Sequence, residues 1–255
     1  MLKYEGEFFM NNTIKELYNR KSVRVFTDEA ISEEERFHIL NSALQAPSAG
    51  NMEMYSIIDV QNQEIKDKLA VLCDNQPFIA KAKLVLIFLA DYQKWYDIFK
   101  DCEGECEDLE ESDLFLAMND SLIAAQNVVV AAESMGIGSC YIGDILENFE
   151  EIQQLFNLPQ YAVPCTMLVF GKPTKQQMER IKPTRFALED MVHVDAYKPK
   201  TNEETRNMFK KQTGKEDDEE LNKYVHAFAK RKFNTGFRHE MNRSVRAIIS
   251  HWTKK

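Results

Sequence analysis

Residues 122–143 read LIAAQNVVVAAESMGIGSCYIG, an apolar run followed by closely spaced glycines. The run Leu122–Ala132 is apolar almost all round, which predicts a helix buried in a core or in a subunit interface. Gly136 and Gly138 end that helix, and Cys140–Ile142 follows as a short extended segment. A dinucleotide fold places its Gly-x-Gly-x-x-Gly pattern between a strand and a helix, so the order found here argues against a Rossmann domain. It favours a backbone that passes close beneath a flat ring system.

The segments on both sides alternate between strand and helix patterns. Two continuous apolar runs, Leu84–Ala90 and Thr166–Phe170, predict strands that are buried on both faces. Ser32 and Glu35 form a capping box at the start of one helix. The other expected elements are a strand at Tyr55–Val60 and helices at Thr13–Asn19, from Ser32 towards Pro47, Ile65–Cys73, Leu114–Met135 and Phe149–Phe156. This alternation indicates a layered domain of helices and strands over residues 13–171.

The chain changes character after Pro199. Residues 203–252 carry more charge and fewer apolar side chains, and their pattern predicts helices throughout. We expect a domain over residues 1–199 and a C-terminal helical extension over residues 200–255 that wraps a neighbour. Residues 92–111 are aromatic and then strongly acidic, which predicts a segment that extends away from the domain as an excursion or forms a lid.

The composition is that of a soluble globular protein, with 44% hydrophobic and 29% charged residues among 255. The net charge of −9 disfavours general nucleic-acid binding, because the phosphate backbone would be repelled. Basic residues gather near the C-terminus, however, and form either a nucleic-acid arm or a dock for one small phosphorylated ligand. No run of 18 apolar residues and no signal layout at the start is found, so we expect a cytoplasmic protein without a membrane segment.

The five cysteines and five histidines do not form a recognisable catalytic or metal-binding pattern. An odd number of cysteines in a chain of this length argues against a disulfide framework. Cys102 and Cys106 lie in an acidic run, but no second pair follows at metal spacing, so reduced surface thiols are favoured over a zinc site. Loops able to cradle a ligand, without a protein nucleophile, suggest a bound cofactor that supplies the reactivity.

Three short segments carry the candidate ligand contacts. In an extended chain alternate residues share a face, so Arg20, Ser22 and Arg24 present two guanidinium groups and a hydroxyl to a phosphate or a polar ring edge. In the loop Ala46–Asn51, small residues let the backbone approach a flat ligand, and Ser48 and Asn51 offer hydrogen bonds. In Lys182-Pro-Thr-Arg185, two cations in a Pro-stiffened loop suit a phosphate. Each pattern taken alone is also typical of a solvated strand or turn.

Together these segments resemble the nitroreductase family, and more closely its branch of NADPH-dependent nitro- and flavin reductases with a long C-terminal extension. The resemblance covers residues 13–199. Its motifs are Arg20–Arg24, Ala46–Ser48, Ala125–Asn127, Ala132–Gly143, Asn157–Pro159, Val169–Pro173 and Lys182–Pro183. It implies an α+β, three-layer fold with a four- or five-stranded mixed central sheet flanked by helices. It also implies an obligate homodimer with FMN at the subunit interface.

The resemblance further assigns residues to the FMN. Those expected at the ring edge, the ribityl chain and the phosphate are Arg20, Lys21, Ser22 and Arg24. Ser48 and Asn51 would come from the partner subunit. Gln76 would reach the polar edge of the flavin, and Phe78 stands where this branch often has Tyr, so that hydroxyl contact is missing. The residues that would pass the reactive N5 are Tyr141, Ile142 and Gly143.

The sequence departs from the family pattern at two places. Asp144 stands where the branch tends to have a second glycine, and a carboxylate beside N5 disfavours an anionic reduced flavin unless it points away. Thr184 interrupts the usual Lys-Pro-Arg, which leaves open whether Lys182 or Arg185 reaches the phosphate. In the extension, Arg231 and Arg238 are candidates for the 2′-phosphate of NADPH.

The implied reaction is ping-pong hydride transfer through the flavin N5, from NADPH or NADH to a nitroaromatic, a quinone or a free flavin. The basic residues of the extension favour NADPH slightly. Two alternatives stay open: another reaction on the same flavoprotein fold, such as dehalogenation or flavin destruction, and a flavin-binding redox sensor without turnover.

Overall fold

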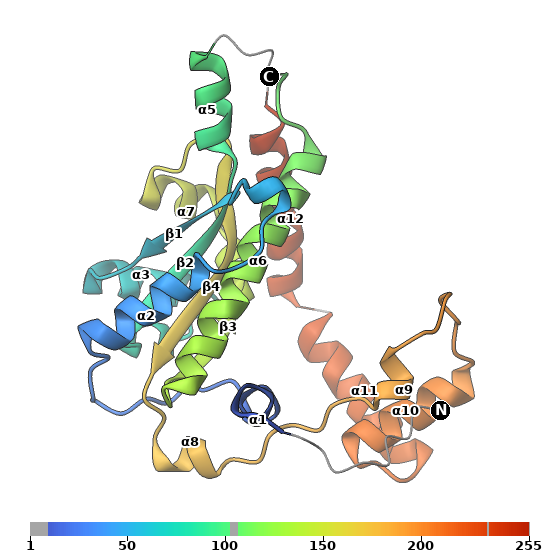
Figure 1. Ribbon diagram of the computed structural model, residues 1–255. Coiled ribbons are helices and arrows are strands. Elements are labelled where there is room, and N and C mark those ends of the chain that lie inside the picture. Colours follow the sequence, from blue (N-terminus) through green and yellow to red (C-terminus); the bar gives the residue numbers. More distant parts are fainter. Residues whose placement is uncertain (1–9, 103–106, 234, 255) are drawn as a thin grey trace. The chain divides into compact units, whose positions relative to one another are not determined.

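The computed structural model describes residues 10–102, 107–233 and 235–254, and these form two compact units (Figure 1). The larger unit contains residues 11–180 together with the C-terminal residues from 239 onward. Among the described residues, the smaller unit contains Met10 and residues 181–238. Along the chain the two units therefore meet at residues 180/181 and 238/239 rather than at residue 200. The domain boundary expected at residue 200 stays a prediction.

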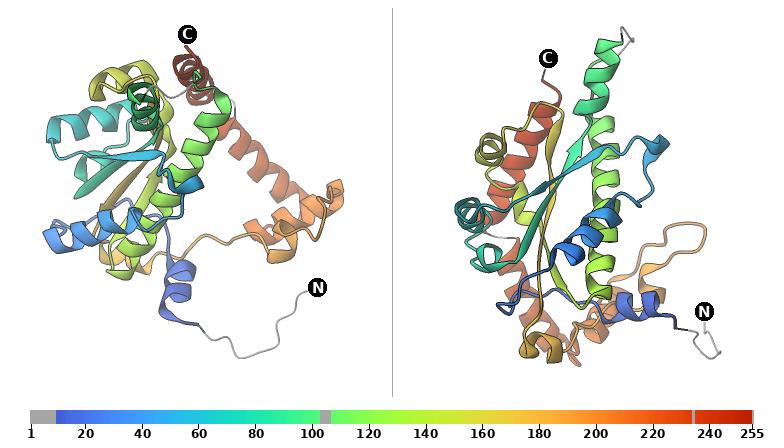
Figure 2. Two further views of the ribbon diagram at one scale, coloured as in Figure 1. Left: turned by 45° about the horizontal axis from the view of Figure 1, so that its top comes forward. Right: turned by 60° about the vertical axis from the view of Figure 1, so that its left-hand side comes forward.

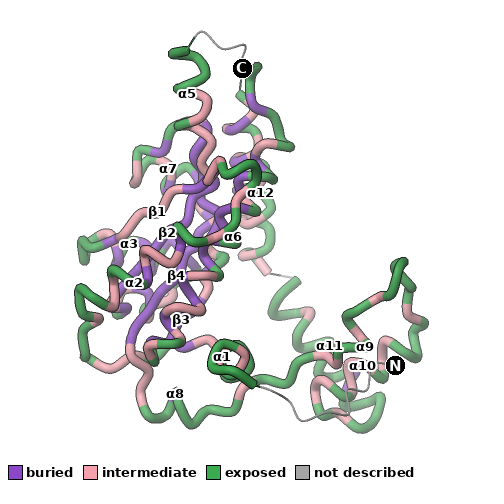
Figure 3. The backbone as a smooth tube through the Cα atoms, in the orientation of Figure 1, coloured by how far each residue is buried: buried purple, intermediate pink, exposed green. Residues whose placement is uncertain are grey.

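The larger unit is built on a four-stranded sheet in the order β1-β2-β4-β3. Its strands are β1 (Tyr55–Asp59), β2 (Leu84–Asp91), β3 (Gly138–Ile142) and β4 (Ala162–Gly171). The two central strands, β2 and β4, are buried almost throughout (Figure 3), which confirms the strands expected from their continuous apolar runs. All pairings between the four strands are antiparallel, and the parallel component is a single bridge between Ser22 and Ser139.

Helices cover both faces of this sheet and confirm the expected α+β layering (Figure 2). On one face lie α2 (Glu33–Ala43) and α6 (Glu111–Ser134), and on the other lie α3 (Gln63–Leu72), α4 (Phe78–Lys81) and α7 (Phe149–Phe156). The remaining helical segments of this unit are α1 (Asn12–Asn19), η1 (Ala49–Asn51), α5 (Gln93–Asp101), η2 (Gly143–Leu146), α8 (Lys175–Glu179) and most of α12 (Gly236–Trp252). The expected capping box at the start of α2 is present.

The long helix α6 has two faces of different character. One face packs on β2 and β4 through small and branched residues such as Ala124 and Val128. The opposite face leaves large apolar side chains exposed, namely Phe115, Leu116, Leu122 and Ile123. By length and composition alone α6 would qualify as a membrane span, but 44% of that window is buried inside the protein. The all-round apolar pattern therefore reflects one core face and one uncovered face.

The end of α12 closes the core at the start of α6. Trp252 is fully buried, and its indole Nε1 donates to the Glu110 carbonyl at 3.1 Å. The excursion expected at residues 92–111 contains helix α5, whose Trp95 donates to the Met52 carbonyl at 2.6 Å. Cys106, in the same stretch, lies outside the described residues.

The smaller unit is helical, as its charge-rich pattern predicts. Its helices are α9 (Leu188–Met191), α10 (Asn202–Thr213) and α11 (Asp218–Lys232). A capping box of Thr201 and Glu204 starts α10, and Arg206 of α10 pairs with Asp218 at 3.0 Å. Few residues of this unit are buried, Leu221 being the clearest case.

Candidate functional site

The segment Arg20–Arg24 lies along strand β3. Ser22 bridges to Ser139, and the backbone N–H of Val23 donates to the Ser139 carbonyl at 2.9 Å. A Cβ at position 138 would stand 2.6 Å from the Val23 side chain, so the close approach requires Gly138. The glycine that ends the apolar helix pattern therefore brings two segments more than a hundred residues apart into contact.

Two guanidinium groups flank the edge of β3. The Cζ atom of Arg20 lies 5.9 Å from the ring centroid of Tyr141, and that of Arg24 lies 5.9 Å from the ring of Phe78. Both act on the buried thiol of Cys140: burial raises the pKa of this thiol, while the neighbouring positive charges oppose the rise. The structure thus brings Arg20, Arg24, Phe78 and Tyr141 together, and their contact with FMN stays a prediction.

These guanidinium groups lack acidic partners. Across the described residues, neither Arg20 nor Arg24 forms an ion pair with a carboxylate. The Nε of Arg20 is buried without a hydrogen-bond partner. A buried donor without an acceptor is costly, so this edge is suited to an anionic or strongly accepting ligand.

Lys21 points the other way, as alternation along an extended segment predicts. Its Nζ donates to the carbonyls of Met178 at 2.6 Å and Arg180 at 2.5 Å, at the end of α8. Arg180 in turn donates to the Ser22 carbonyl. Lys21 therefore anchors the backbone after α8, and a direct contact from Lys21 to FMN stays a prediction.

The turn after β3 presents backbone to open space. Ile142 is buried, whereas a Cβ at Gly143 would meet no atom within 4 Å. The Tyr141 hydroxyl donates to Gln126 Oε1 at 3.2 Å, and burial raises the pKa of Tyr141 to about 12. Tyr141 therefore stays protonated at neutral pH, and its side chain can line a binding site or donate a hydrogen bond.

The turn after α3 faces the same region. Gln76 donates from its backbone to the Ala70 carbonyl and from its side-chain amide to the Cys73 carbonyl, both at 2.8 Å. Burial raises the pKa of the Cys73 thiol, and the charge of Asp144 raises it further. Asp144 therefore lies near the turn that carries Gln76, on the side expected to hold the polar edge of a ring.

Two neighbours of this site carry no recognisable motif in the sequence. Glu147 is 5% exposed, and burial raises its pKa to about 7, helped by the charges of Asp144, Asp74 and Glu240. Asn148 has a φ of 49°, a backbone conformation that asparagine tolerates better than most residues. The one feature of the sequence that hints at this turn is the asparagine itself, which comes directly before the helix Phe149–Phe156.

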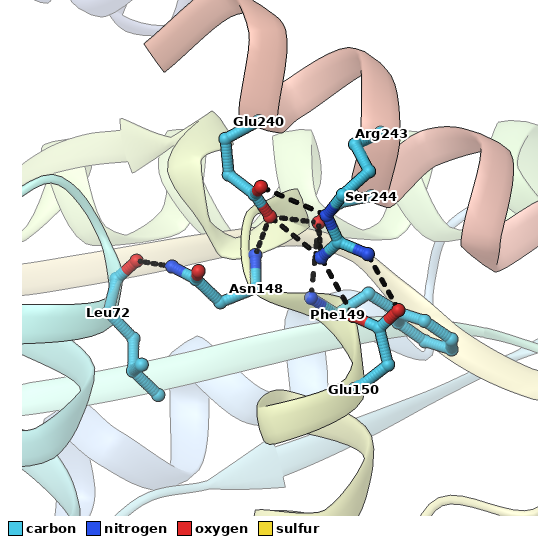
Figure 4. Close-up of polar contacts among 7 residues, drawn as sticks. All are labelled: Leu72, Asn148, Phe149, Glu150, Glu240, Arg243 and Ser244. Atoms are coloured by element: carbon cyan, nitrogen blue, oxygen red, sulfur yellow. Dashed lines mark hydrogen bonds and ion pairs between the residues drawn. The ribbon is translucent and has the colours of Figure 1, made fainter. Parts of the chain in front are cut away.

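Asn148 ties the turn after β3 to two other elements (Figure 4). Its side-chain amide donates to the Leu72 carbonyl at 2.9 Å, and its backbone N–H donates to Glu240 Oε1 at 3.2 Å. On α12, Ser244 donates to Glu240 at 2.8 Å and accepts from the Phe149 N–H at 3.3 Å. We call this set, completed by the ion pairs of Arg243 with Glu240 and Glu150, the α12 clasp.

Ser48 and Asn51 lie elsewhere in the chain. The Ser48 hydroxyl donates to Asp120 Oδ2 at 2.6 Å and accepts from the Glu53 N–H at 2.6 Å. Asp120 also accepts from the Ala49 and Met54 N–H groups, each at 3.1 Å, so this buried carboxylate holds the loop. Sequence reasoning missed Asp120, although a lone carboxylate inside an apolar helix pattern was a usable signal.

Within one chain these two places are far apart. Arg20 lines the same shallow pocket as Glu133 of α6, and Glu133 follows Asp120 by thirteen residues along that helix. A rise of 1.5 Å per residue puts Asp120 and Glu133 about 20 Å apart. One copy of the chain therefore does not bring Ser48 and Asn51 to Arg20.

The remaining candidates belong to the smaller unit and are described within it. Lys182 is partly buried and Arg185 is exposed, on a loop whose Thr184 carbonyl accepts from Gln212 of α10 at 3.2 Å. Arg231 and Arg238 stack over phenylalanine rings, those of Phe228 at 5.5 Å and Phe233 at 5.1 Å. Their contacts with a phosphate or with NADPH stay predictions.

The residues at the β3 edge fit FMN. The two guanidinium groups, which form no ion pair with a described carboxylate, and the buried Arg20 Nε suit its phosphate and polar ring atoms, and the open side of Gly143 leaves room for a flat ring. The set offers hydrogen-bond donors and positive charge to a bound molecule.

The chain is similar in sequence and fold to several known proteins. The model of the Nitroreductase family matches residues 17–172. The FMN reductase (NADPH) of Bacillus subtilis (strain 168) is 36% identical over 167 residues, covering 64% of this chain and 67% of the relative. The NADPH-flavin oxidoreductase of Vibrio harveyi is 32% identical over 74% of this chain and 75% of its own length. The solved structure of NfrA2 from B. megaterium superimposes with a TM-score of 0.76 at 30% identity, over 92% of this chain and 98% of that one.

Proposed function

Because the chain belongs to the Nitroreductase family, we propose that it is an FMN-dependent NAD(P)H oxidoreductase that reduces nitroaromatics, quinones or flavins by ping-pong hydride transfer. Within the structure, the observation that carries this proposal is the pair of guanidinium groups at the edge of β3, neither of which pairs with a carboxylate of the described residues. The relatives' names, which describe reductases acting with NADPH on flavins, support the same chemistry.

The chain's own residues position the cofactor and tune the charge around it. Bound FMN supplies the hydride-accepting ring nitrogen. Arg20 and Arg24 would hold its anionic and polar atoms with charge-assisted hydrogen bonds and would favour negative charge on the ring. The backbone of Ile142 and Gly143 would support the flavin ring, and Tyr141, protonated at neutral pH, would present a neutral side chain to it. The chemistry thus depends on orientation and electrostatics rather than on a nucleophile of the protein.

We further propose that the working form is a homodimer. The Ser48–Asn51 loop lies about 20 Å along α6 from the Arg20 end, so a second copy is the natural source of this loop at the flavin. The exposed apolar side chains of α6, Phe115, Leu116, Leu122 and Ile123, supply a surface for that copy. We also propose that the enzyme works in the cytoplasm. Its substrates are small molecules, and it binds neither nucleic acid nor a membrane.

Anaerobic stopped-flow absorbance tests the activity. We expect the flavin band at ~450 nm to bleach on mixing with NADPH, more slowly with NADH, and to recover on mixing with a nitroaromatic or a quinone. A flavin that binds but is not bleached by either nucleotide would favour the redox sensor. Bleaching that none of these acceptors reverses would favour a different reaction on the same fold.

A further inference from the structure

A cleft lies beside the proposed flavin site, between the segment Arg24–Asp28 and helices α3 and α4. Its volume is about 790 Å³, which falls in the range of small-molecule sites. Much of its wall is apolar, including Phe26, Pro77 and Phe78. Only Arg24 and Phe78 are shared with the residues assigned to FMN, so most of this cleft has no role in the proposed reaction.

A nearly buried ammonium group lines this cleft. Lys66 of α3 is 8% exposed, and its Nζ has one described acceptor, the Ala82 carbonyl at a long 3.4 Å. It forms no ion pair within the described chain. Burial lowers its pKa, and the charges of Arg36 and Lys83 lower it further. An ammonium group in this environment is stabilised most by an anion.

Positively charged side chains also outnumber negatively charged ones in the rest of the lining. Arg24, Lys81 and Lys83 line the cleft with Lys66, whereas Asp28 is its single carboxylate among the described lining residues. The side chain of Asp28 is fully exposed and stands 3.7 Å from Lys83, which makes a weak pair. A concentration of positive charge in one cleft of a protein with a net charge of −9 attracts anions locally.

We propose that this cleft binds an aromatic acid, with its anionic group at Lys66 and its ring against Phe26 and Phe78. The apolar wall selects the ring, and the charge selects the acid over its neutral analogue. The assignment does not depend on the proposed oxidoreductase activity, because Lys66 and Phe26 lie outside the flavin contacts and only Phe78 of the proposed contacts is shared with them.

Equilibrium dialysis of the FMN-loaded protein tests this assignment with 1-naphthoate and its neutral analogue 1-naphthamide. At pH 7 we expect naphthoate to bind at least about tenfold more tightly than naphthamide, which corresponds to one charge-assisted contact. Lys66→Met, which keeps the length of the side chain but removes its charge, should abolish this preference. Lys68→Met, at an exposed position of the same helix, should leave it unchanged.

Equal binding of the two probes, or an unchanged preference in Lys66→Met, would overturn the proposal. So would naphthoate binding that occurs only without FMN, because the probe would then occupy the flavin site. If Lys66→Met does not fold, Lys83→Met replaces it. We then expect a smaller preference for naphthoate over naphthamide, and an unchanged preference would count against the proposal. Flavin content and NADPH oxidation are measured in parallel, so failure of the proposed activity is seen separately from failure of this cleft.

Discussion

Arg24 is shared by the proposed flavin site and the cleft that contains Lys66. Its guanidinium lies over Phe78 on one side and near Cys140 on the other. It is exposed and has no acidic partner among the described residues, so its removal costs the fold little. Its contribution is expected in ligand binding.

We predict that Arg24→Ala weakens FMN retention about tenfold or more, since a hydrogen bond to a charged group contributes roughly 1.5–3 kcal/mol. Arg24→Lys should restore part of the loss, because it keeps the charge but not the planar fork. The measurement is flavin content after dialysis at known FMN concentration. Arg246→Ala, at an exposed position of α12, is the control. Undiminished occupancy in Arg24→Ala would remove Arg24 from the site.

Glu147 gives the fold a pH dependence. Its pKa in the folded protein is about 7, above the ordinary 4.5, so the folded state binds this proton more tightly than the unfolded chain. The resulting stabilisation is complete below pH 4.5 and is lost as the pH rises through 7.

We therefore predict that Glu147→Gln, which imitates the protonated form, raises the free energy of unfolding at pH 8 by about 1–3 kcal/mol. The difference from the wild type should shrink towards zero at pH 5. Urea unfolding at a series of pH values measures it, with the exposed Glu151→Gln as control. A difference that is the same at pH 5 and pH 8 would contradict the buried-carboxyl account.

At the scale of elements, the α12 clasp fixes the turn after β3. Its ion pairs involve Arg243, which is half exposed, so they contribute little individually. The hydrogen bond from Arg243 holds the pKa of Glu240 at about 2. The buried member is Ser244, which joins Glu240 to the first N–H of α7. Stability should therefore depend more on the serine than on the arginine.

We predict that Ser244→Ala lowers the free energy of unfolding by about 1–3 kcal/mol, because it leaves a buried N–H and part of a carboxylate without partners. Ser250→Ala, exposed on the same helix, should change it by less than about 0.5 kcal/mol. Chemical denaturation compares the two variants. Equal effects would show that the clasp contributes nothing beyond helix propensity.

Element boundaries follow closely from local sequence where the physics is local. The helix Phe149–Phe156 has the predicted bounds, and the capping box fixes the start of α2. Helix α6 begins at Glu111, three residues before the expected start, because Glu110 and Asp113 form a further capping box. The apolar pattern alone does not contain that polar signal.

At the scale of the whole molecule, the uncovered face of α6 predicts assembly. Phe115, Leu116, Leu122 and Ile123 recur at heptad spacing and are all more than 40% exposed. Four large apolar side chains on one helix face are expected to be covered by a second copy in solution.

We predict a dimer for the wild type and a monomer with reduced FMN retention for Leu122→Glu, because a charge would be buried at the interface. Light scattering coupled to size-exclusion chromatography measures the mass. Ser112→Glu adds the same charge at the exposed start of α6 and should remain dimeric. A monomeric wild type would contradict the assembly, and a dimeric Leu122→Glu would place the interface elsewhere.

The sequence by itself determined the strands and the longer helices, the family, and the kind of ligand, since apolar periodicity, caps and short cationic motifs act over a few neighbouring residues, whereas the short helices α4, α5 and α8 carried no such pattern. Only the tertiary structure decided which distant groups share an environment. Ser48 meets Asp120 across 72 positions, and Asn148 meets Glu240 across 92. The raised pKa of Glu147 and the buried ammonium of Lys66 arise in the same way. The desolvation and electrostatic energy of a buried group depend on all the groups packed around it, and a local sequence pattern does not contain that information.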